Sequence, residues 1–411
     1  MNVLIVSTHD QQGGAAIAAY RLMEALNKNG VMARMLTIDK QSDNTNVVEV
    51  GSPLINKGRF IAERGVIYFQ NGFSKKYLFD ISLANAGVSI TKHPEFKKAD
   101  IIHLHWINQG MLSVREIGKI VASGKKIVWT MHDMWPFTGI CHHAGQCIHF
   151  EKGCEMCPYL NNPSKHDISY TTFLLKQAAY SQGKIHFVAC SNWLKELAVK
   201  SKLTKDHKVS AIANPINTEL YKPKDKTEVR KALNLPTDKK IVLFAAAKVS
   251  DKRKGIDYLV EASKIISNER GNNILFLIAG GNSQEIITQL ALPAISVGYV
   301  ASEEMPDMYN AADLFVTPSL QENLPNTIME SMACGTACVG FNIGGIPEMI
   351  DHKQNGYVAN YKDAQDLANG LLWVLQESDT EILSDNARNK VVTNYSEAII
   401  AKRYIEIYNK E

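Results

Sequence analysis

Two glutamates eight residues apart, Glu322 and Glu330, bracket the start of a predicted helix. Pro325 suits the first position of this helix, because its missing N–H costs nothing there. The backbone N–H groups of Asn326 and Thr327 then lie at the positive end of the helix, which is suited to an anion such as pyrophosphate. The carboxylates accept hydrogen bonds from hydroxyl groups on either side of that anion. The stretch therefore predicts a binding site for a nucleotide-sugar, with a hexose at one end and a ribose at the other.

A second candidate group lies in the basic loop 248–255, which follows an apolar run at 240–246. Cleavage of a nucleotide-sugar leaves a diphosphate, and cations directed at it stabilise the growing negative charge. Lys248 and Lys254 are the candidates. The sequence has no obvious DxD-type metal motif where the phosphates belong. We therefore expect the two lysines to replace a metal and the chemistry to need no cofactor, whereas the alternative is a solvated basic loop.

The elements that must position these residues alternate along the chain. Short apolar runs, each of the kind that forms a buried strand, are separated by helical stretches; they lie at 1–7, 100–106, 126–130, 186–190, 240–246, 274–279 and 313–316. Such alternation predicts α/β domains with parallel, doubly wound sheets, whose ligands bind at the carboxyl ends of strands. The 411 residues exceed what one core supports, so we expect two domains of roughly 200 residues each.

Composition narrows the class of protein. Hydrophobic residues make up 45% and charged residues 21% of the chain, as in ordinary soluble globular proteins, and the net charge of +3 gives no reason to expect nucleic acid as a partner. The opening apolar run is short and lacks a basic leader, so it predicts a first strand and not a signal peptide. Seven cysteines, an odd number, argue against a disulfide framework. We expect a cytoplasmic protein.

The stretch from Glu322 to Glu348 resembles glycosyltransferase family 4, a family of retaining glycosyltransferases with the GT-B fold. Residues 322–330 match the family's E-x7-E signature, and residues 331–335 and 344–348 match the motifs that follow it. The resemblance implies that Glu322 holds the donor sugar and that Glu330 holds the ribose. It also implies two Rossmann-like domains that face a central cleft, with a C-terminal helix that crosses back to the first domain.

The resemblance also implies domain limits and further donor contacts. We expect an acceptor-side domain at 1–215, a donor domain at 216–395 and the returning helix at 396–411. The family's arginine and lysine, six residues apart, correspond to Lys248 and Lys254. The substitution of arginine by Lys248 loses a bidentate fork, for which neighbouring Arg253 can compensate. The remaining nucleotide-binding candidates are Gly13 and Gly14 after the first strand, together with Gly280, Val300 and Leu324.

A histidine follows the apolar run at 126–130, in the stretch His132-Asp133-Met134-Trp135-Pro136-Phe137-Thr138-Gly139. Family members related to capsule and exopolysaccharide synthesis carry a similar stretch, and their matching histidine lines the active-site cleft. The resemblance therefore implies that His132 touches the transferred sugar or the acceptor hydroxyl. Asp133 is a weaker candidate, either for an acceptor contact or for orienting His132. We expect His132, Lys254 and Glu322 to be the catalytic residues.

A cysteine-rich loop at 139–160 contains Cys141, Cys147, Cys154 and Cys157. Four cysteines that close with a C-x2-C pair fit a tetrahedral structural zinc site in a reducing compartment. The spacing differs from the standard zinc fingers, so reduced packing thiols and redox-sensitive pairs stay open as alternatives. A catalytic zinc is not expected, because all four ligands would come from the protein.

A basic and aromatic segment at 54–79 allows two interpretations. It carries Lys57, Arg59, Arg64, Lys75 and Lys76 among large apolar side chains. One interpretation is an amphipathic surface that lies on an anionic membrane, where a lipid-linked acceptor is presented. The other, which the composition favours slightly, is a helix that packs on its own domain and exposes a solvated basic face.

The resemblance thus implies a retaining glycosyltransferase that moves a sugar from a UDP- or GDP-linked donor to a glycan or lipid-linked oligosaccharide acceptor in bacterial surface polysaccharide synthesis. Its expected location is the cytoplasm, with peripheral contact at the inner face of the membrane. One alternative is a sugar-nucleotide epimerase or a phosphorylase on the same fold. Another is a non-catalytic homologue that binds nucleotide-sugars.

Overall fold

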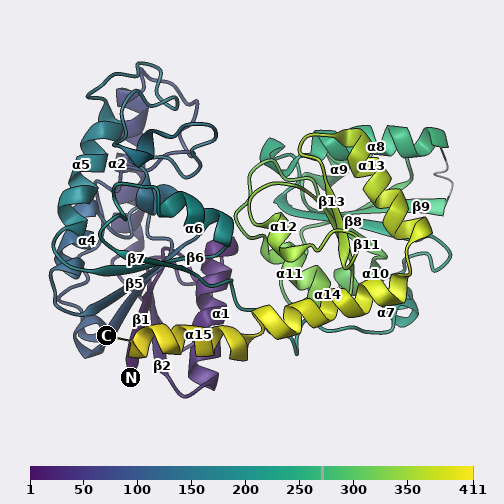
Figure 1. The fold of residues 1–411 in the computed structure, drawn as a ribbon, viewed down its shortest axis with the longest axis horizontal. Coiled ribbons are helices and arrows are strands. Elements are labelled where there is room, and N and C mark those ends of the chain that lie inside the picture. The colour runs from purple at the N-terminus through teal and green to yellow at the C-terminus, as the bar shows by residue number, and fades with distance from the viewer. Residues whose placement is uncertain (270–272, 411) are drawn as a thin grey trace. The chain divides into compact units, whose positions relative to one another are not determined.

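A computed structural model describes residues 1–269 and 273–410 of the chain (Figure 1). Contacts between residues divide the chain into two units. The first consists of residues 1–215 together with 400–411, and the second of residues 216–399. Within the described ranges, no helix is both long and apolar enough to cross a membrane.

The first unit is built on a seven-stranded parallel sheet in the order β3-β2-β1-β4-β5-β6-β7. Its strands are β1 (Asn2–Val6), β2 (Met32–Thr37), β3 (Val47–Glu49), β4 (Ile101–Leu104), β5 (Lys126–Met131), β6 (Ile185–Ala189) and β7 (Lys208–Ala211). The strand order reverses where β1 pairs with both β2 and β4. In open parallel sheets, ligands bind beyond the carboxyl ends of the strands at such a reversal.

Helices cover both faces of this sheet, because alternate residues of each strand point to opposite sides. Leu4, Ile102 and Trp129 belong to one buried cluster, whereas Val3, Ile101 and Val128 belong to another. The helices of the unit are α1 (Gly14–Lys28), α2 (Pro53–Gln70), α3 (Pro94–Lys98), α4 (Val114–Val121), α5 (Ile168–Tyr180), α6 (Asn192–Ala198) and α15 (Glu397–Asn409), with 3-10 turns at Trp135–Phe137 and His149–Glu151.

Helix α2 packs on its unit through an unusual set of side chains. Its buried residues are Asn56, Glu63, Arg64 and Ile67. Arg64 pairs with Glu63 at 3.0 Å and donates to the carbonyl oxygen of Ile81 at 2.9 Å. The sequence-based assignment of Arg64 to a solvated basic face was therefore wrong. Most of the large apolar residues of α2 instead remain exposed, namely Leu54, Ile55, Ile61, Val66 and Phe69.

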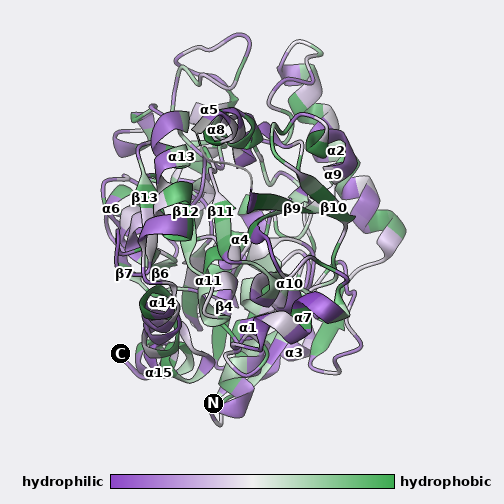
Figure 2. Cartoon of the chain, turned by 90° about the vertical axis from the view of Figure 1, so that its right-hand side faces the viewer, coloured by the Kyte–Doolittle hydropathy of each residue, from purple (hydrophilic) through white to green (hydrophobic). Residues whose placement is uncertain are grey.

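The second unit repeats the same design with six parallel strands in the order β10-β9-β8-β11-β12-β13. They are β8 (Lys240–Lys248), β9 (Ile274–Gly281), β10 (Ala294–Gly298), β11 (Leu314–Thr317), β12 (Cys338–Phe341) and β13 (Gly356–Ala359). Figure 2 shows strands such as β9 and β12 in the green of hydrophobic residues, as expected for parallel strands buried on both faces. The order reverses between β8 and β11, which places the loops that follow these two strands next to each other.

The helices of the second unit follow its strands. They are α7 (Lys226–Ala232), α8 (Ile256–Glu269), α9 (Ser283–Ile287), α10 (Met305–Ala311), α11 (Asn326–Ala333), α12 (Ile346–Met349), α13 (Ala364–Leu372) and α14 (Thr380–Tyr395). A 3-10 turn at Lys252–Lys254 precedes α8. A π-helical turn at Trp373–Glu377 separates α13 from α14.

The C-terminal helix α15 is tied to the first unit by a buried hydrogen-bond chain. Its Tyr408 hydroxyl lies 2.7 Å from Nδ1 of His103 on β4, and Nε2 of the same ring lies 2.8 Å from Oγ1 of Thr130 on β5. The hydroxyl of Tyr404 lies 2.7 Å from the same Thr130 oxygen. Burial, followed by the nearby His132 and His186, lowers the pKa of His103 from 6.5 to about 3. His103 is therefore neutral at pH 7.

This network predicts a pH dependence of stability. Below pH 6.5 the unfolded chain protonates His103 while the folded chain does not, so the free energy of unfolding falls as the pH falls toward about 3. Each such histidine contributes a slope of about 1.4 kcal/mol per pH unit. The variant His103→Gln should show a slope smaller by up to that amount.

Denaturant titrations followed by tryptophan fluorescence test this prediction, since Trp106, Trp129, Trp135 and Trp193 lie in the first unit. The exposed His166 provides the control, and His166→Gln should keep the wild-type slope. Equal slopes in the His103 and His166 variants would contradict the assignment.

Candidate functional site

The end of β11 and the loop after β8 bring two predicted catalytic residues together in the second unit. The ammonium of Lys254 forms an ion pair with Oε1 of Glu322. The hydroxyl of the buried Ser319 donates to the same carboxylate oxygen at 3.2 Å. The side chains of Lys254 and Glu322 are 37% and 14% exposed, so both remain accessible to a ligand. Two residues that lie 68 positions apart in the sequence thus share one site.

Close backbone contacts hold these loops in place. Gly255 has a φ of +71°, and a Cβ atom there would lie 1.7 Å from the carbonyl oxygen of Pro318. Gly344 has a φ of +59°, and a Cβ atom there would lie 1.9 Å from the carbonyl oxygen of Glu322. Any other residue at either position would push the loops apart. The two glycines therefore fix the backbone on both sides of the Lys254–Glu322 pair.

Helix α11 begins one residue later than expected. Pro325 is its N-cap and not its first residue, because its ψ of 121° is extended, so the prediction that the helix starts at Pro325 was wrong. Asn326 and Thr327 then occupy the first two helical positions and are partly exposed. The first N–H groups of a helix have no acceptor within that helix, and they lie at its positive end. The expected anion-binding geometry is thus retained.

Glu330 lies one turn into α11 and is oriented by a residue that the sequence analysis missed. It is 7% exposed, and its Oε2 accepts a 2.9 Å hydrogen bond from the hydroxyl of Tyr309 on α10. Tyr309 is fully buried. Because Tyr309 belongs to no motif and its contact depends on how α10 packs against α11, no sequence pattern indicates this role.

The other predicted cations are placed differently from Lys254. Lys248 is exposed at the last position of β8. The guanidinium of Arg253 makes a two-pronged ion pair with the carboxylate of Asp251, with Nη2 at 2.7 Å from Oδ2 and Nε at 3.1 Å from Oδ1. This guanidinium is therefore already engaged in the described chain, which leaves Lys248 as the cation at the family's arginine position.

Three more residues predicted to contact the nucleotide, Gly280, Val300 and Leu324, lie near the carboxyl ends of strands in the sheet of the second unit. Gly280 has a φ of +129°, and a Cβ atom there would lie 1.7 Å from the carbonyl oxygen of Ala246, so the approach of β9 to β8 itself requires glycine. Val300 lies in the loop between β10 and α10, and Leu324 is 7% exposed. Leu324 can therefore offer a ligand little more than its main chain.

His132 follows β5 in the first unit and contacts another histidine. Its Nε2 lies 2.9 Å from Nδ1 of His105, and its Nδ1 lies 3.5 Å from Sγ of Cys190. Burial lowers the pKa of His132 to about 4, even though Asp133 acts in the opposite direction. Because burial also lowers the pKa of His105, both rings are neutral at pH 7. His132 is thus suited to hydrogen bonding and not to carrying charge.

Asp133 organises the loop in which it lies. Its Oδ2 accepts hydrogen bonds from Nε1 of Trp106 at 2.8 Å and from Nδ1 of His142 at 2.7 Å, and its Oδ1 accepts one from the backbone N–H of Trp135 at 2.8 Å. Burial alone would raise the pKa of Asp133, but the interactions with His142, His143 and Trp135 outweigh it and lower the pKa to about 2. Both carboxylate oxygens of Asp133 thus accept hydrogen bonds that hold the surrounding loops in place.

The glycine turn after β1 has the predicted backbone form. Gly13 is the N-cap of α1 with a φ of +91°, and Gly14 is the first residue of that helix. Both residues are exposed. The turn therefore presents a helix N-terminus at the carboxyl edge of the first sheet, where the reversal of strand order lies.

The four cysteines of the loop at 139–160 are free thiols that line one cavity. Across residues 1–269 and 273–410, however, no three His, Cys, Asp or Glu side chains already have a metal-binding arrangement. The structural zinc ion expected from the sequence therefore stays a prediction.

Comparisons with known proteins agree with this architecture. The family model described as Glycosyltransferase Family 4 matches residues 12–220, which is half of the chain, and the model described as Glycosyl transferases group 1 matches residues 225–390. An uncharacterised glycosyltransferase of Methanocaldococcus jannaschii is 29% identical over 334 residues, covering 76% of this chain and 83% of that protein.

A second relative matches over a shorter region. The UDP-Gal:alpha-D-GlcNAc-diphosphoundecaprenol alpha-1,3-galactosyltransferase of Escherichia coli is 26% identical over 222 residues, which cover 52% of this chain and 56% of that protein. The chain thus aligns with about half the length of this relative.

Solved structures show the same fold. Sucrose-phosphate synthase of Thermosynechococcus elongatus has a TM-score of 0.68 at 19% identity, covering 99% of this chain and 98% of that one. HepE of Anabaena, in complex with UDP and glucose, has a TM-score of 0.64 at 16% identity, covering 99% of both chains. Two parallel sheets in the Rossmann order and the two matching family models lead to one conclusion: the chain belongs to glycosyltransferase family 4 and is a glycosyltransferase with the GT-B fold.

Proposed function

We propose that this enzyme transfers a sugar from a nucleotide-sugar to a glycan or lipid-linked acceptor during bacterial surface polysaccharide synthesis, with retention of configuration at the transferred sugar. The observation that carries the proposal is the Lys254–Glu322 pair beside the N-terminus of α11. A cation, a carboxylate and a positive helix end lie within one short stretch of backbone, at the strand-order reversal between β8 and β11. This combination suits a sugar diphosphate.

Each group has a distinct role in the proposed reaction. Lys254 stabilises the negative charge that grows on the departing diphosphate, together with Lys248 and the first N–H groups of α11. Glu322 accepts hydrogen bonds from hydroxyls of the transferred sugar, and Glu330 accepts them from the ribose. The ammonium of Lys254 has three N–H donors, so it can retain Glu322 with one and bind a phosphate oxygen with another.

On the first unit, the proposed catalytic residue is His132. Its ring is neutral at pH 7, and Nδ1, whose contact with Sγ of Cys190 is long at 3.5 Å, is the nitrogen that would contribute a hydrogen bond to the transferred sugar or the acceptor hydroxyl without adding a charge. Nδ1 of His105 lies 2.9 Å from its Nε2 and fixes the orientation of the ring. Gly13 and Gly14 place backbone without side chains at the N-terminus of α1, which suits an anion such as a phosphate.

The names of relatives support a UDP-linked donor and a lipid-linked acceptor. The Escherichia coli relative uses UDP-Gal and acts on a diphosphoundecaprenol-linked sugar, and a Campylobacter jejuni relative is also named for a diphospho-undecaprenol acceptor. A relative from Erwinia amylovora is named for amylovoran biosynthesis. A GDP-linked donor remains the alternative.

Two other activities are compatible with the fold. An epimerase would convert the nucleotide-sugar without any acceptor, and a phosphorylase would need inorganic phosphate. A non-catalytic homologue would bind the donor without turnover. The intact Lys254–Glu322 pair favours transfer over simple binding, because a cation beside the leaving diphosphate also stabilises the further negative charge that develops there in the transition state.

Charge-removing variants of the ion pair test the proposed transfer. Glu322→Gln and Lys254→Ala should each lower kcat by about 10²–10³, because each removes one group that stabilises the transition state. Turnover is measured as nucleoside diphosphate released in the presence of acceptor. The exposed pair Glu261 and Lys264 supplies matched controls, so Glu261→Gln and Lys264→Ala should keep wild-type turnover. Wild-type rates in the Glu322 and Lys254 variants would contradict the proposal.

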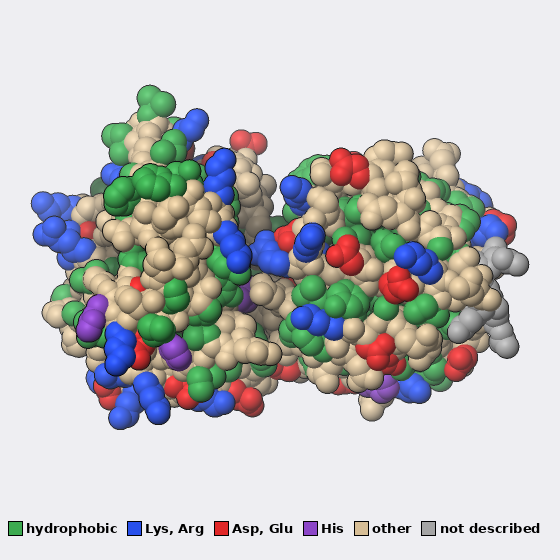
Figure 3. Space-filling view, turned by 90° about the horizontal axis from the view of Figure 1, so that it is seen from above, with side chains coloured by type: hydrophobic (Ala, Val, Ile, Leu, Met, Phe, Trp, Pro, Cys, Tyr) green, Lys and Arg blue, Asp and Glu red, His purple; other side chains and the backbone are tan. Residues whose placement is uncertain are grey.

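We further propose that α2 and the turn after it dock the enzyme on an anionic membrane, which carries the lipid-linked acceptor. Seven large apolar side chains of this segment are exposed: Leu54, Ile55, Ile61, Val66, Phe69, Phe73 and Phe79. Lys57, Lys75 and Lys76 are exposed among them. Figure 3 shows hydrophobic and basic side chains gathered together on the first unit, at the left of the view. Apolar side chains enter the headgroup region, and lysines attract anionic lipids.

Vesicle sedimentation tests this surface. The double variant Leu54→Ser and Phe69→Ser should weaken binding to phosphatidylglycerol vesicles at least about tenfold, because each exposed apolar side chain loses its transfer into lipid. Leu175 on α5 is 55% exposed outside the segment, and Leu175→Ser should bind as wild type does. Equal binding by all three proteins, or equal binding to neutral vesicles, would contradict docking through α2.

A further inference from the structure

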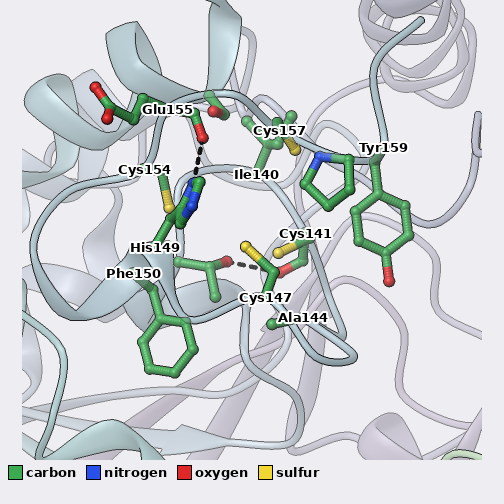
Figure 4. Close-up of a pocket in the computed structure, with 13 residues that line it drawn as sticks. Ile140, Cys141, Ala144, Cys147, His149, Phe150, Cys154, Glu155, Cys157 and Tyr159 are labelled. Atoms are coloured by element: carbon green, nitrogen blue, oxygen red, sulfur yellow. Dashed lines mark hydrogen bonds between the residues drawn. The ribbon is translucent and has the colours of Figure 1, made fainter. Parts of the chain in front are cut away.

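The cysteine-rich loop at 139–160 gathers all four of its thiols around one small cavity. Cys141, Cys147, Cys154 and Cys157 line a space of about 20 Å³, which is enough for one water-sized occupant. Figure 4 shows their sulfur atoms on several sides of this space, coming from separate turns of the loop. Three of the four are nearly buried, with exposures of 6–8%, and Cys147 is half-buried.

Hydrogen-bond donors point at two of these sulfur atoms. The backbone N–H of Gly139 donates to Sγ of Cys154 at 3.0 Å. The backbone N–H of Tyr159 donates to Cys157, which lies two residues earlier in the C-x2-C pair. N–H groups directed at sulfur stabilise thiolates and orient them toward a metal. A Cβ atom at position 139 would lie 2.5 Å from the carbonyl oxygen of Ser169, so only glycine permits this approach.

A buried lysine accompanies the thiols. Lys176 on α5 is fully buried and donates from Nζ to the carbonyl oxygens of Trp135 at 2.6 Å and Thr138 at 3.0 Å. Its side chain lies near both Cys141 and Cys154. The two carbonyl oxygens carry no charge, so a centre of thiolates beside this lysine would favour its ammonium form.

A cross-link would also stabilise the long connection between β5 and α5. Between the end of β5 and the start of α5, the described chain forms only two 3-10 turns, and the loop at 139–160 contains one of them. A metal ion bound by the four thiols would anchor a loop that has little regular structure of its own.

We propose that the four thiols bind one Zn²⁺ ion as a structural site. Four thiols lose their protons to solvent, and four sulfur–zinc bonds form around the ion in a tetrahedron. The resulting centre carries a net charge of minus two and lies near the buried side chain of Lys176. Since the described side chains do not yet have coordinating geometry, the thiols must turn inward when the metal binds. The site has no open position and thus does not take part in sugar transfer.

Metal analysis of the full-length protein tests the proposal. Protein purified without chelator should contain about one zinc ion per chain. A mercurial thiol reagent should release that zinc. The double variant Cys147→Ser and Cys157→Ser should lose it. Cys334→Ala and Cys338→Ala change buried cysteines of the second unit and should retain it.

A second measurement keeps the test decisive if the cysteine variants fold poorly. Wild-type protein stripped of metal and loaded with Co²⁺ should show the visible absorption of tetrahedral cobalt with thiolate ligands. Three results would overturn the proposal: zinc far below one ion per chain in wild type with no such cobalt spectrum, zinc retained by the double variant, or an intact mass that reveals disulfide bonds among the four cysteines.

Discussion

The carbonyl oxygen of Pro318 occupies the space where a side chain at position 255 would begin, and the candidate site depends on this contact. Gly255 immediately follows Lys254, and Pro318 lies four residues before Glu322. The contact therefore fixes the distance over which the lysine and glutamate side chains meet. The N–H of Leu320 adds a 2.7 Å hydrogen bond to the carbonyl oxygen of Arg253. A rigid backbone of this kind positions charges before a ligand arrives, which is what electrostatic catalysis requires.

In the first unit, by contrast, the buried histidines near the carboxyl ends of β4 and β5 are kept uncharged. His103 and His105 are buried two residues apart, on β4 and just beyond it, and each makes a hydrogen bond to a neighbouring element. One of these bonds reaches α15 and the other reaches His132. The same desolvation that keeps these rings neutral thus serves both the attachment of the C-terminal helix and the proposed sugar contact.

The sequence predicted those features that depend on local order along the chain. The alternation of apolar runs and helices predicted parallel α/β sheets, and two predicted site residues, Lys254 and Glu322, lie together in the structure. The sequence could not reveal Ser319 or Tyr309 as partners of the two glutamates, because those contacts depend on packing between elements. The predicted start of α11 was one residue too early, because proline is compatible with both an N-cap and a first helical position.

Helix α2 shows that composition alone does not identify which face of a helix is buried. Its apolar residues occur on most sides of the helix, so periodicity alone did not identify the packed face. The structure buries Glu63 and Arg64 as a pair and exposes Leu54 and Phe69. A buried ion pair of this kind is invisible in sequence, because the same two residues on a solvated helix look identical.

Hydrogen exchange of the full chain with and without a saturating nucleoside diphosphate, UDP and then GDP, tests the central claim most directly. The account predicts slower exchange in residues 248–256 and 322–330, because their backbone N–H groups surround the proposed phosphate position. Unchanged exchange in both segments under saturating ligand, with protection elsewhere in the described chain, would contradict it.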